Sequence, residues 1–264
     1  MRFATWNVNS IRARADRVAA WLEQSDVDVL AMQEIKCKPE QFPTAPFAAL
    51  GYEVAAHGLD QWNGVAIASR IGLDDVELQF AGQPGFAKTG DPRVEARAIG
   101  ATCGDTHVWS VYVPNGRALD DPHLQYKLEW LAALRECARV ELAAGRPLAI
   151  CGDFNIAPTD SDVWDPAEFV GSTHVSAPER RALQEILSLG LTDLQPRALK
   201  GEPFTYWDYR AGNFHKGFGM RIDLLLVDPQ LAQGVMDIYI DRDARKGTKP
   251  SDHAPVVADL GTPR

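Results

Sequence analysis

The sequence has few cysteines, no long apolar run and an early loss of apolar character at its start. Four cysteines in 264 residues, none in a Cys-x-x-Cys spacing, indicate buried reduced thiols rather than a disulfide scaffold. The longest apolar runs are far shorter than the roughly 20 residues that cross a bilayer, which excludes a membrane-spanning helix. The first residues become polar too early for a secretory signal. We therefore expect a cytoplasmic protein that enters no membrane.

Basic charge is also scarce. The 27 Lys and Arg residues face 36 Asp and Glu residues, for a net charge of −9. A protein that coats nucleic acid through phosphate contacts alone would carry the opposite balance, so DNA packaging is excluded. The balance does not exclude an enzyme whose acidic side chains hold a divalent cation that meets a phosphate. Repeats, low-complexity tracts and Pro/Gly/Ser-rich linkers are absent, so we predict one domain over residues 1–264.

Hydrophobic periodicity predicts an α/β protein. Apolar or alternating runs predict strands over residues 2–8, 27–32, 52–56, 65–68, 94–102, 107–113, 148–151, 222–227, 235–240 and 256–260. Helices are predicted directly after Asn9 and Ser10, which would cap the first one, and over residues 122–144 and 178–189. Several strands follow one another with no helix between them, which favours mixed or antiparallel sheets. Two sheets packed face to face with helices outside fit this order.

Polar side chains stand where the predicted strands begin or end. These residues are Asn7, Glu34, Asp153, Asn155 and the pair Asp252 and His253. If the strand ends converge, oxygen-bearing side chains and an imidazole surround one cavity, a donor set suited to Mg²⁺ or Mn²⁺. Zinc is disfavoured because the sequence has no His/Cys quartet at ligand spacing. Taken singly, each residue has a simpler reading as a helix cap, a turn residue or a solvated strand end.

Two local patterns suggest acid–base chemistry. Asp153 and Asn155 are two residues apart, so on an extended chain both side chains point to one face. An Asp there could take a proton from water while the Asn donates to a phosphate oxygen, although a turn after the strand is an equal alternative. Asp223 places a charge at the start of an apolar strand and needs a partner, for which His253 is the candidate.

A third group follows the strand over residues 107–113. Tyr112 closes this strand, and Asn115 and Arg117 lie in the turn beyond it. A phenol, an amide and a guanidinium could bind phosphate oxygens together. The simpler alternative is an interfacial tyrosine followed by a surface turn.

With these residues assembled, the chain resembles the exonuclease III family of apurinic/apyrimidinic endonucleases, within the DNase I-like metal-dependent phosphodiesterases. Seven blocks in order carry the resemblance over essentially the whole chain. They are Thr5-Trp6-Asn7-Val8-Asn9-Ser10, Gln33-Glu34, Val111-Tyr112-Val113-Pro114-Asn115-Gly116, Gly152-Asp153-Phe154-Asn155-Ile156-Ala157-Pro158, Phe204-Thr205-Tyr206-Trp207-Asp208-Tyr209-Arg210, Arg221-Ile222-Asp223 and Ser251-Asp252-His253.

The resemblance implies a four-layer α/β sandwich in which two packed mixed β-sheets are flanked by helices. It implies a DNA repair nuclease that hydrolyses the backbone 5′ to abasic sites and trims 3′ ends as a 3′-to-5′ exonuclease and 3′-phosphatase. The expected substrate is double-stranded DNA with abasic sites or blocked 3′ ends, the expected cofactor is Mg²⁺ or Mn²⁺, and family habit suggests a monomer.

The resemblance also assigns roles. Glu34 would be the main metal ligand, and the candidate ligands together are Asn7, Glu34, Asp153, Asn155, Asp252 and His253. Asp153 would activate the attacking water or relay a proton, and Asn155 would hold the phosphate oxygens. Tyr112 would contact the scissile phosphate or the leaving oxygen. Asp223 would orient His253 against a phosphate oxygen.

Substrate contacts fall to the loops. The candidates for DNA binding are Asn115, Arg117, Tyr206, Trp207, Arg210, Trp62 and Arg93. For Tyr206 and Trp207 packing in the core is an equal alternative. Two other functions stay open: a metal-dependent phosphatase of the same superfold that acts on inositol phosphates or lipids, and a scaffold that has lost its chemistry. The fully occupied set of polar positions argues against the scaffold.

Overall fold

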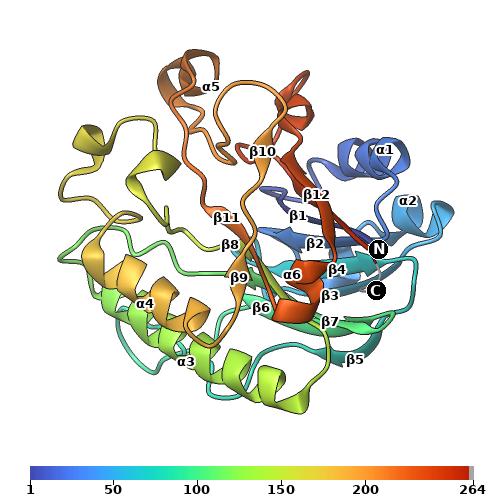
Figure 1. Cartoon of the computed structure of the whole chain (residues 1–264), viewed down its shortest axis with the longest axis horizontal. Helices are drawn as coiled ribbons and strands as arrows, with labels where there is room; N and C mark the ends of the chain where they lie inside the picture. Colours follow the sequence, from blue (N-terminus) through green and yellow to red (C-terminus); the bar gives the residue numbers. More distant parts are fainter. Residues whose placement is uncertain (262–264) are drawn as a thin grey trace.

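The computed structural model describes residues 1–261, and in this part of the chain two β-sheets lie face to face between helices (Figure 1). The first sheet contains, in spatial order, β10 (Arg197–Ala198), β12 (Val235–Ile240), β13 (Val256–Leu260), β1 (Arg2–Asn7), β2 (Val29–Gln33), β4 (Val65–Ser69) and β3 (Glu53–His57). The second contains β5 (Asp74–Glu77), β6 (Ala98–Cys103), β7 (Thr106–Tyr112), β8 (Leu148–Asp153), β11 (Asp223–Val227) and β9 (Thr192–Asp193).

Both sheets are mixed. β1 runs parallel to β2, β7 to β8 and β10 to β12, whereas the other neighbouring strands run antiparallel. Strands adjacent in sequence, such as β6 and β7, pair directly because only a tight turn separates them. The sequence prediction of mixed sheets is confirmed.

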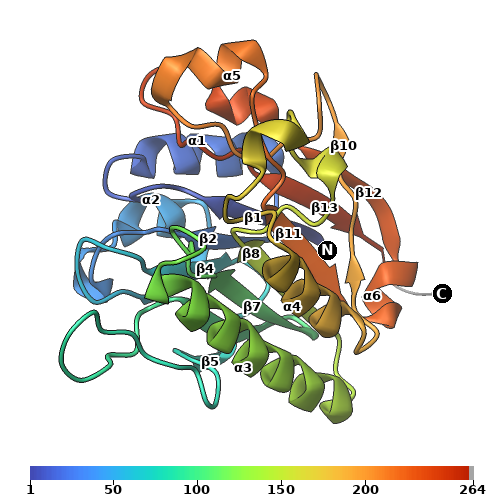
Figure 2. The ribbon, with the colours of Figure 1, turned by 90° about the vertical axis from the view of Figure 1, so that its left-hand side faces the viewer.

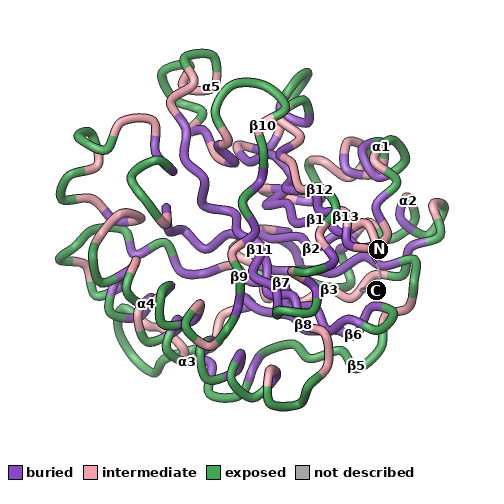
Figure 3. Tube along the Cα trace, viewed as in Figure 1, coloured by how far each residue is buried: buried purple, intermediate pink, exposed green. Residues whose placement is uncertain are grey.

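Helices cover the outer face of each sheet. α1 (Ala15–Ser25) and α2 (Thr44–Ala49) pack on the first sheet, and α3 (Pro122–Ala144) and α4 (Ala177–Leu187) pack on the second (Figure 2). Between the sheets lies a buried apolar layer that includes Phe3 and Ile67 from one sheet and Val108 and Leu225 from the other (Figure 3). Two helical layers outside two sheets make the predicted four-layer sandwich, which is confirmed.

The longest helix has the two ends that the sequence predicts. The Asp121 carboxylate accepts a hydrogen bond of 2.8 Å from the backbone N–H of His123, and Pro122 occupies the first helical position. At the other end Gly145 has a φ of 73°, which satisfies the left-handed C-cap. The prediction over residues 122–144 is therefore confirmed at both ends.

The first helix begins later than predicted. Asn9 and Ser10 have positive φ angles of 43° and 85° and do not cap a helix, and α1 starts at Ala15. The reason is that the backbone beyond β1 goes on pairing with the chain beyond β2: Ser10 N–H donates to the Glu34 carbonyl at 2.6 Å. Tertiary pairing outweighs the local capping preference here and holds Asn9 beside Glu34.

Several short or weakly patterned elements were not predicted. They are β5, β9, β10, α5 (Asn213–Lys216) and α6 (Pro229–Gln233). The strand expected over residues 94–102 starts only at Ala98. The expectation for the cysteines is confirmed, since Cys37, Cys103, Cys137 and Cys151 are buried and free. Within residues 1–261 no helix has the length and apolarity of a membrane span.

Gly152 allows β7 and β8 to approach each other directly before Asp153. Its φ is 140°, and a Cβ atom there would lie 2.0 Å from the carbonyl oxygen of Val111. Only glycine fits this contact without a backbone shift.

We predict that Gly152→Ala lowers the free energy of unfolding by about 3 kcal/mol, because the added methyl group must push β7 away from β8. Urea denaturation measures this loss. The matched control is Gly145→Ala, where φ is also positive but a Cβ would meet open space, and the expected cost is about 1 kcal/mol. Equal losses in the two variants would mean that the close contact does not constrain the sheet.

Candidate active site

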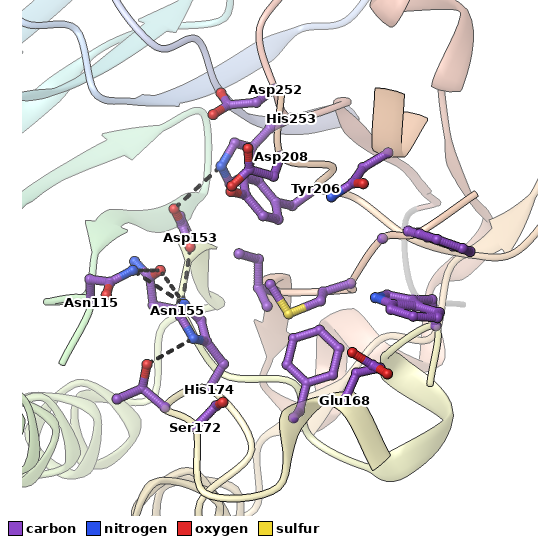
Figure 4. A pocket seen from close by; sticks show the side chains of 18 of the residues that line it. Asn115, Asp153, Asn155, Glu168, Ser172, His174, Tyr206, Asp208, Asp252 and His253 are labelled. Carbon is purple, nitrogen blue, oxygen red and sulfur yellow. Dashed lines mark hydrogen bonds and ion pairs between the residues drawn. The ribbon is translucent and has the colours of Figure 1, made fainter. Parts of the chain in front are cut away.

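Most of the predicted site residues line one pocket. This pocket has a volume of about 630 Å³ and opens at the edge of the two sheets (Figure 4). Among its lining residues are Glu34, Tyr112, Asn115, Arg117, Asp153, Asn155, Tyr206, Arg210, Asp252 and His253. The strand ends therefore converge as the sequence predicts.

Strand register explains the convergence. In the second sheet, Tyr112 at the end of β7 stands opposite Asp153 at the end of β8, and Asp153 stands opposite Asp223 at the start of β11. In the first sheet Asn7 stands opposite Gln33, and Glu34 follows with a φ of 53°. The two sheets thus present their polar ends to the same opening.

Glu34, Asp153 and His253 form the centre of the site. One ligand atom of each lies within 4.8 Å of the other two. The Asn7 amide lies between the carboxylates, since its Nδ2 donates to Glu34 Oε1 at 2.9 Å and to Asp153 Oδ2 at 3.0 Å. Lys36 Nζ forms an ion pair of 2.8 Å with Glu34 Oε2. Burial raises the pKa of Glu34, but Lys36 and Asn7 outweigh it and hold that pKa below its usual range.

His253 is paired with Asp223, as the sequence analysis predicted. His253 Nδ1 lies 2.8 Å from Asp223 Oδ2, and His253 Nε2 lies 3.7 Å from Asp153 Oδ2. The main chain around the imidazole is fixed on β1, because Trp6 Nε1 donates to the His253 carbonyl at 3.1 Å. Burial alone would lower the pKa of His253, but the charges of Asp223 and Asp153 outweigh it and raise the pKa to about 10. The imidazole is therefore protonated at neutral pH, with Nε2–H directed at the pocket side.

Asp153 is a buried acid with other carboxylates close to it. Burial raises its pKa to about 7, since Asp223 and Glu34 add to the rise and the positive charge of His253 only partly offsets it. A carboxyl group with a pKa near neutrality is suited to accept a proton at neutral pH.

Asn155 is held rigidly beside Asp153. Its φ is 51°, its backbone N–H donates to Asp153 Oδ1 at 2.9 Å, and its Nδ2 donates to the Val113 carbonyl at 3.0 Å. Its Oδ1 lies 3.1 Å from both Asn115 Nδ2 and His174 Nε2 (Figure 4). The chain is not extended at Asn155, so the turn after the strand, the alternative left open by the sequence, is what the structure has. Both side chains still line the pocket, and neighbouring groups fix the orientation of the amide.

Three residues that support Asn155 were not predicted. Lys127 on α3 is fully buried, donates to the Asn155 carbonyl at 2.7 Å and pairs with Glu179 on α4 at 2.5 Å. Glu179 also accepts from the backbone N–H of His174 at 3.0 Å. The spacing of Ser176 and Glu179 is typical of a helix start, but no sequence signal indicates that a lysine inside a long amphipathic helix is buried.

Tyr112 faces the cluster from the second sheet. Burial, together with the nearby Glu34 carboxylate, raises the pKa of Tyr112 well above its ordinary value, so its phenol keeps its proton. Arg97 lies over the ring at 4.9 Å and pairs with Glu95 at 2.6 Å. Neither Arg97 nor Glu95 was among the sequence candidates.

Four predicted DNA contacts lie together on one side of the pocket. Trp62, Arg93, Asn115 and Arg117 line an adjoining depression of about 510 Å³ that shares Tyr112 with the main pocket. The Trp62 side chain is 65% exposed, and Arg93 and Arg117 are also exposed. Their chemistry and position suit contact with a nucleic-acid backbone.

On the opposite side the prediction is partly wrong. Tyr206 packs against the His253 ring with centroids 4.9 Å apart, and Arg210 is exposed and paired with Asp208. Trp207, in contrast, is 1% exposed and lies in an apolar cluster, so it cannot contact DNA from this position. Arg221, from one of the motif blocks, is likewise buried in ion pairs with Asp162 and Asp193.

Three candidate metal ligands have other partners. The Asn155 Oδ1 atom faces the Asn115 amide and the His174 imidazole, both at 3.1 Å. The Oδ1 atom of Asn7 accepts from the Asn9 backbone N–H at 3.0 Å while its Nδ2 faces the carboxylates, so Asn7 does not offer an oxygen to the centre as predicted. Asp252 lines the pocket, but its Oδ1 accepts from Asn9 Nδ2 at 3.0 Å, outside the central three residues.

Comparison with known proteins defines the class. Residues 4–253 match the model of the endonuclease/exonuclease/phosphatase family. The chain belongs to this family. It is 31% identical to exodeoxyribonuclease III of Haemophilus influenzae, over 98% of this chain and 100% of that protein.

Solved structures agree with this assignment. A 3′ phosphatase from Neisseria, bound to a product DNA hairpin, has a TM-score of 0.91 and 38% identity and covers 98% of this chain and 99% of its own. An AP endonuclease from Archaeoglobus fulgidus has a TM-score of 0.90 and 36% identity over 98% and 99% of the two chains. The protein is thus a nuclease of the exodeoxyribonuclease III group, and the resemblance noted in the sequence is confirmed.

We predict that Asp223→Asn lowers the pKa of His253, because burial then favours the neutral imidazole. In NMR titrations of the metal-free protein, the wild-type His253 should stay protonated through pH 8, and the variant should lose its proton at least about 1 pH unit lower than the wild type. Nuclease activity should fall about 10–100-fold. His57, on the distant β3, is the internal reference. An unchanged His253 titration would contradict the assigned pairing.

Proposed function

We propose that this protein hydrolyses the DNA backbone 5′ to abasic sites and trims 3′ ends as a 3′-to-5′ exonuclease and 3′-phosphatase, with Mg²⁺ or Mn²⁺ as cofactor. The observation that carries the proposal is the cluster of Glu34, Asp153 and His253 at the pocket, backed by Asp223. Relatives described as an exodeoxyribonuclease III, a 3′ phosphatase and an AP endonuclease support the range of substrates. All these site residues come from one chain, which is compatible with action as a monomer.

The residues present fit a hard divalent cation. Two carboxylates face each other across the Asn7 amide, and their nearest positive partners are Lys36 and His253. Carboxylate oxygens are the ligands that Mg²⁺ and Mn²⁺ prefer. Glu34 and Asp153 would hold the ion, and Lys36 would have to release Glu34 Oε2. When bound, such an ion neutralises charge on the phosphate and leaving-group oxygens.

The chain's own groups supply the remaining chemistry. Asp153 would accept a proton from the attacking water. His253, kept protonated by Asp223, donates from Nε2 to a non-bridging phosphate oxygen as negative charge builds there. Tyr112 contributes a neutral phenol O–H to the phosphate or the leaving oxygen. Asn155 would position the phosphate group beside Asp153.

Two surfaces, one on each side of the pocket, would position the DNA. On one side Trp62, Arg93 and Arg117 offer an aromatic face and two guanidinium groups to the backbone. On the other side an apolar part of the pocket contains Trp164 and Phe218, whose rings stack with centroids 3.9 Å apart. We propose that this apolar part receives the sugar that lacks a base, since it offers ring faces but few charges.

The direct test uses a hairpin oligonucleotide with one abasic site, beside a matched hairpin with a plain recessed 3′ end and one with a 3′-phosphate. With Mg²⁺ we expect incision 5′ to the abasic site and removal of 3′ groups. Chelator should abolish both activities, and Asp153→Asn should lower the rate at least about 10²-fold, because no group then accepts the proton from water.

The matched control is Asp160→Asn, an exposed carboxylate that pairs with Arg180. Its activity should equal that of the wild type. Cleavage that persists in chelator would reject the cation. Activity on 3′ ends alone would remove abasic-site incision from the proposal, and cleavage of inositol phosphates or sphingomyelin without cleavage of DNA would change the substrate class.

We predict that Glu34→Ala raises the Mg²⁺ concentration needed for half-maximal activity at least about tenfold, with partial rescue by excess ion, because a principal ligand is lost. Mn²⁺ binding, measured by water-proton relaxation, should weaken in parallel. Lys36→Met should shift Mn²⁺ binding in the opposite direction, since the competing ammonium group is removed. If Glu34→Ala loses activity equally at every Mg²⁺ concentration, Glu34 is not a ligand.

A further inference from the structure

A second cluster of metal-ligand type lies at the other end of the second sheet. It consists of Glu77 on the edge strand β5, His107 near the start of β7 and Glu141 in the last turn of α3. One ligand atom from each residue lies within 4.8 Å of the other two. His107 and Tyr112 are five residues apart on one strand, so the cluster is about 16 Å from the nuclease site. Figure 1 shows β5 and the end of α3 on the same side of the molecule.

The imidazole of His107 is aimed into this cluster without a partner. His107 is fully buried, and its Nε2 has no hydrogen bond among the described residues. Its Nδ1 lies 3.3 Å from Thr102 Oγ1, and this hydroxyl donates its only hydrogen to Asp75 Oδ2 at 3.1 Å. Nδ1 must therefore be the donor in its contact with Thr102. The lone pair of the neutral imidazole is then on Nε2, directed toward the glutamates.

This arrangement places three acceptors together. His107 Nε2 lies 3.9 Å from Glu77 Oε1 and 3.7 Å from Glu141 Oε1. If Nε2 carried a proton, a charge-assisted hydrogen bond to either carboxylate would be about 2.8 Å long, and the half-exposed Glu77 side chain is free to make one. Both separations exceed a hydrogen bond. Acceptors that face one another in a partly buried cluster favour a cation between them.

We propose that Glu77, His107 and Glu141 form a binding site for a divalent transition-metal cation, Zn²⁺ in the first place. Ligand atoms at about 2.0–2.1 Å around a tetrahedral zinc ion lie about 3.3–3.4 Å apart. The two separations from His107 Nε2, 3.9 Å and 3.7 Å, need only a small contraction to reach this value. Imidazole nitrogen with carboxylate oxygen suits zinc far better than Mg²⁺. Three protein ligands leave the fourth position to water.

The surroundings support this site. Arg146 donates to Glu141 Oε2 from Nε at 3.2 Å and from an Nη at 2.9 Å, which fixes the carboxylate and leaves Oε1 toward His107. Asp75 fixes the ring through Thr102, the kind of indirect support that metal-bound histidines usually have. The carboxylates of Glu77, Glu141 and Asp75 outnumber the single positive charge of Arg146. The local charge therefore favours a cation.

The location gives the ion a structural role. β5 is an exposed edge strand whose pairing with β6 is irregular between Asp74 and Glu77. A bridge from Glu77 to His107 and Glu141 ties this edge to a central strand and to the end of α3. Such a bridge stabilises the folded chain in proportion to zinc occupancy. The search for Cys/His quartets in the sequence could not detect this site, because two of its ligands are glutamates.

The test removes the nuclease site first, since that site also binds cations. Metal-stripped protein carrying Glu34→Ala and Asp153→Asn is titrated with Zn²⁺ against a chromophoric chelator. We expect one zinc ion per chain and a melting temperature that rises with zinc concentration. Co²⁺ in place of zinc should give the strong visible absorption of a tetrahedral site with a nitrogen ligand.

In the same background, Glu77→Gln should weaken zinc affinity at least tenfold and remove the thermal shift. Glu77 is at the surface, so this variant folds even if the buried His107→Gln does not. Glu136→Gln, an exposed glutamate on α3 paired with Arg139, is the matched control and should bind as the parent does. The proposal is overturned if the parent binds no zinc, if Glu77→Gln binds equally well, or if Co²⁺ gives only a weak octahedral spectrum.

Discussion

The burial of charge at the end of the two sheets constrains everything else in this protein. Asp153, Asp223 and His253 are almost wholly removed from water, and charges in that position are stable only when they are paired. Asp223 compensates the imidazolium, and the imidazolium in turn partly compensates Asp153. When Glu34 and Lys36 are included, three negative and two positive groups leave a net charge of −1. The site is therefore built to receive a cation, and a cation completes it electrostatically.

The fold satisfies this constraint through strand register. Because β8 is parallel to β7 and antiparallel to β11, residues at the end of two strands and at the start of a third stand side by side. Gly152 permits the close approach at this point, and the loop that carries His253 is fixed to β1 through Trp6. Layer packing thus determines the distances between groups that catalyse a reaction. A small change in the separation of the two sheets would change the distances between the site residues that they carry.

The sequence predicted those parts of the molecule that depend on local pattern. No single polar residue at a strand end indicates a site, but the recurrence of such residues, together with the family resemblance, placed Glu34, Asp153 and His253 in one site. The pairing of Asp223 with His253 followed from the cost of an isolated charge in an apolar strand. The sequence left core packing of Trp207 as an equal alternative and could not decide it, because an aromatic residue in a basic loop has the same local pattern whether it faces solvent or core. Lys127 and His107 escaped prediction for a similar reason: their partners come from other elements, and only the tertiary structure brings them together.

The acidic composition of a DNA-directed enzyme also has a physical explanation. Several basic side chains around the pocket are already neutralised, Arg97 by Glu95 at 2.6 Å and Arg210 by Asp208 at 2.5 Å. Arg93 and Arg117, in contrast, are exposed beside the pocket. A protein with a net charge of −9 gains little from long-range attraction, which salt screens within about 10 Å. Recognition of a phosphate backbone by such a chain therefore depends on short-range contacts at the pocket rather than on the field of the whole protein.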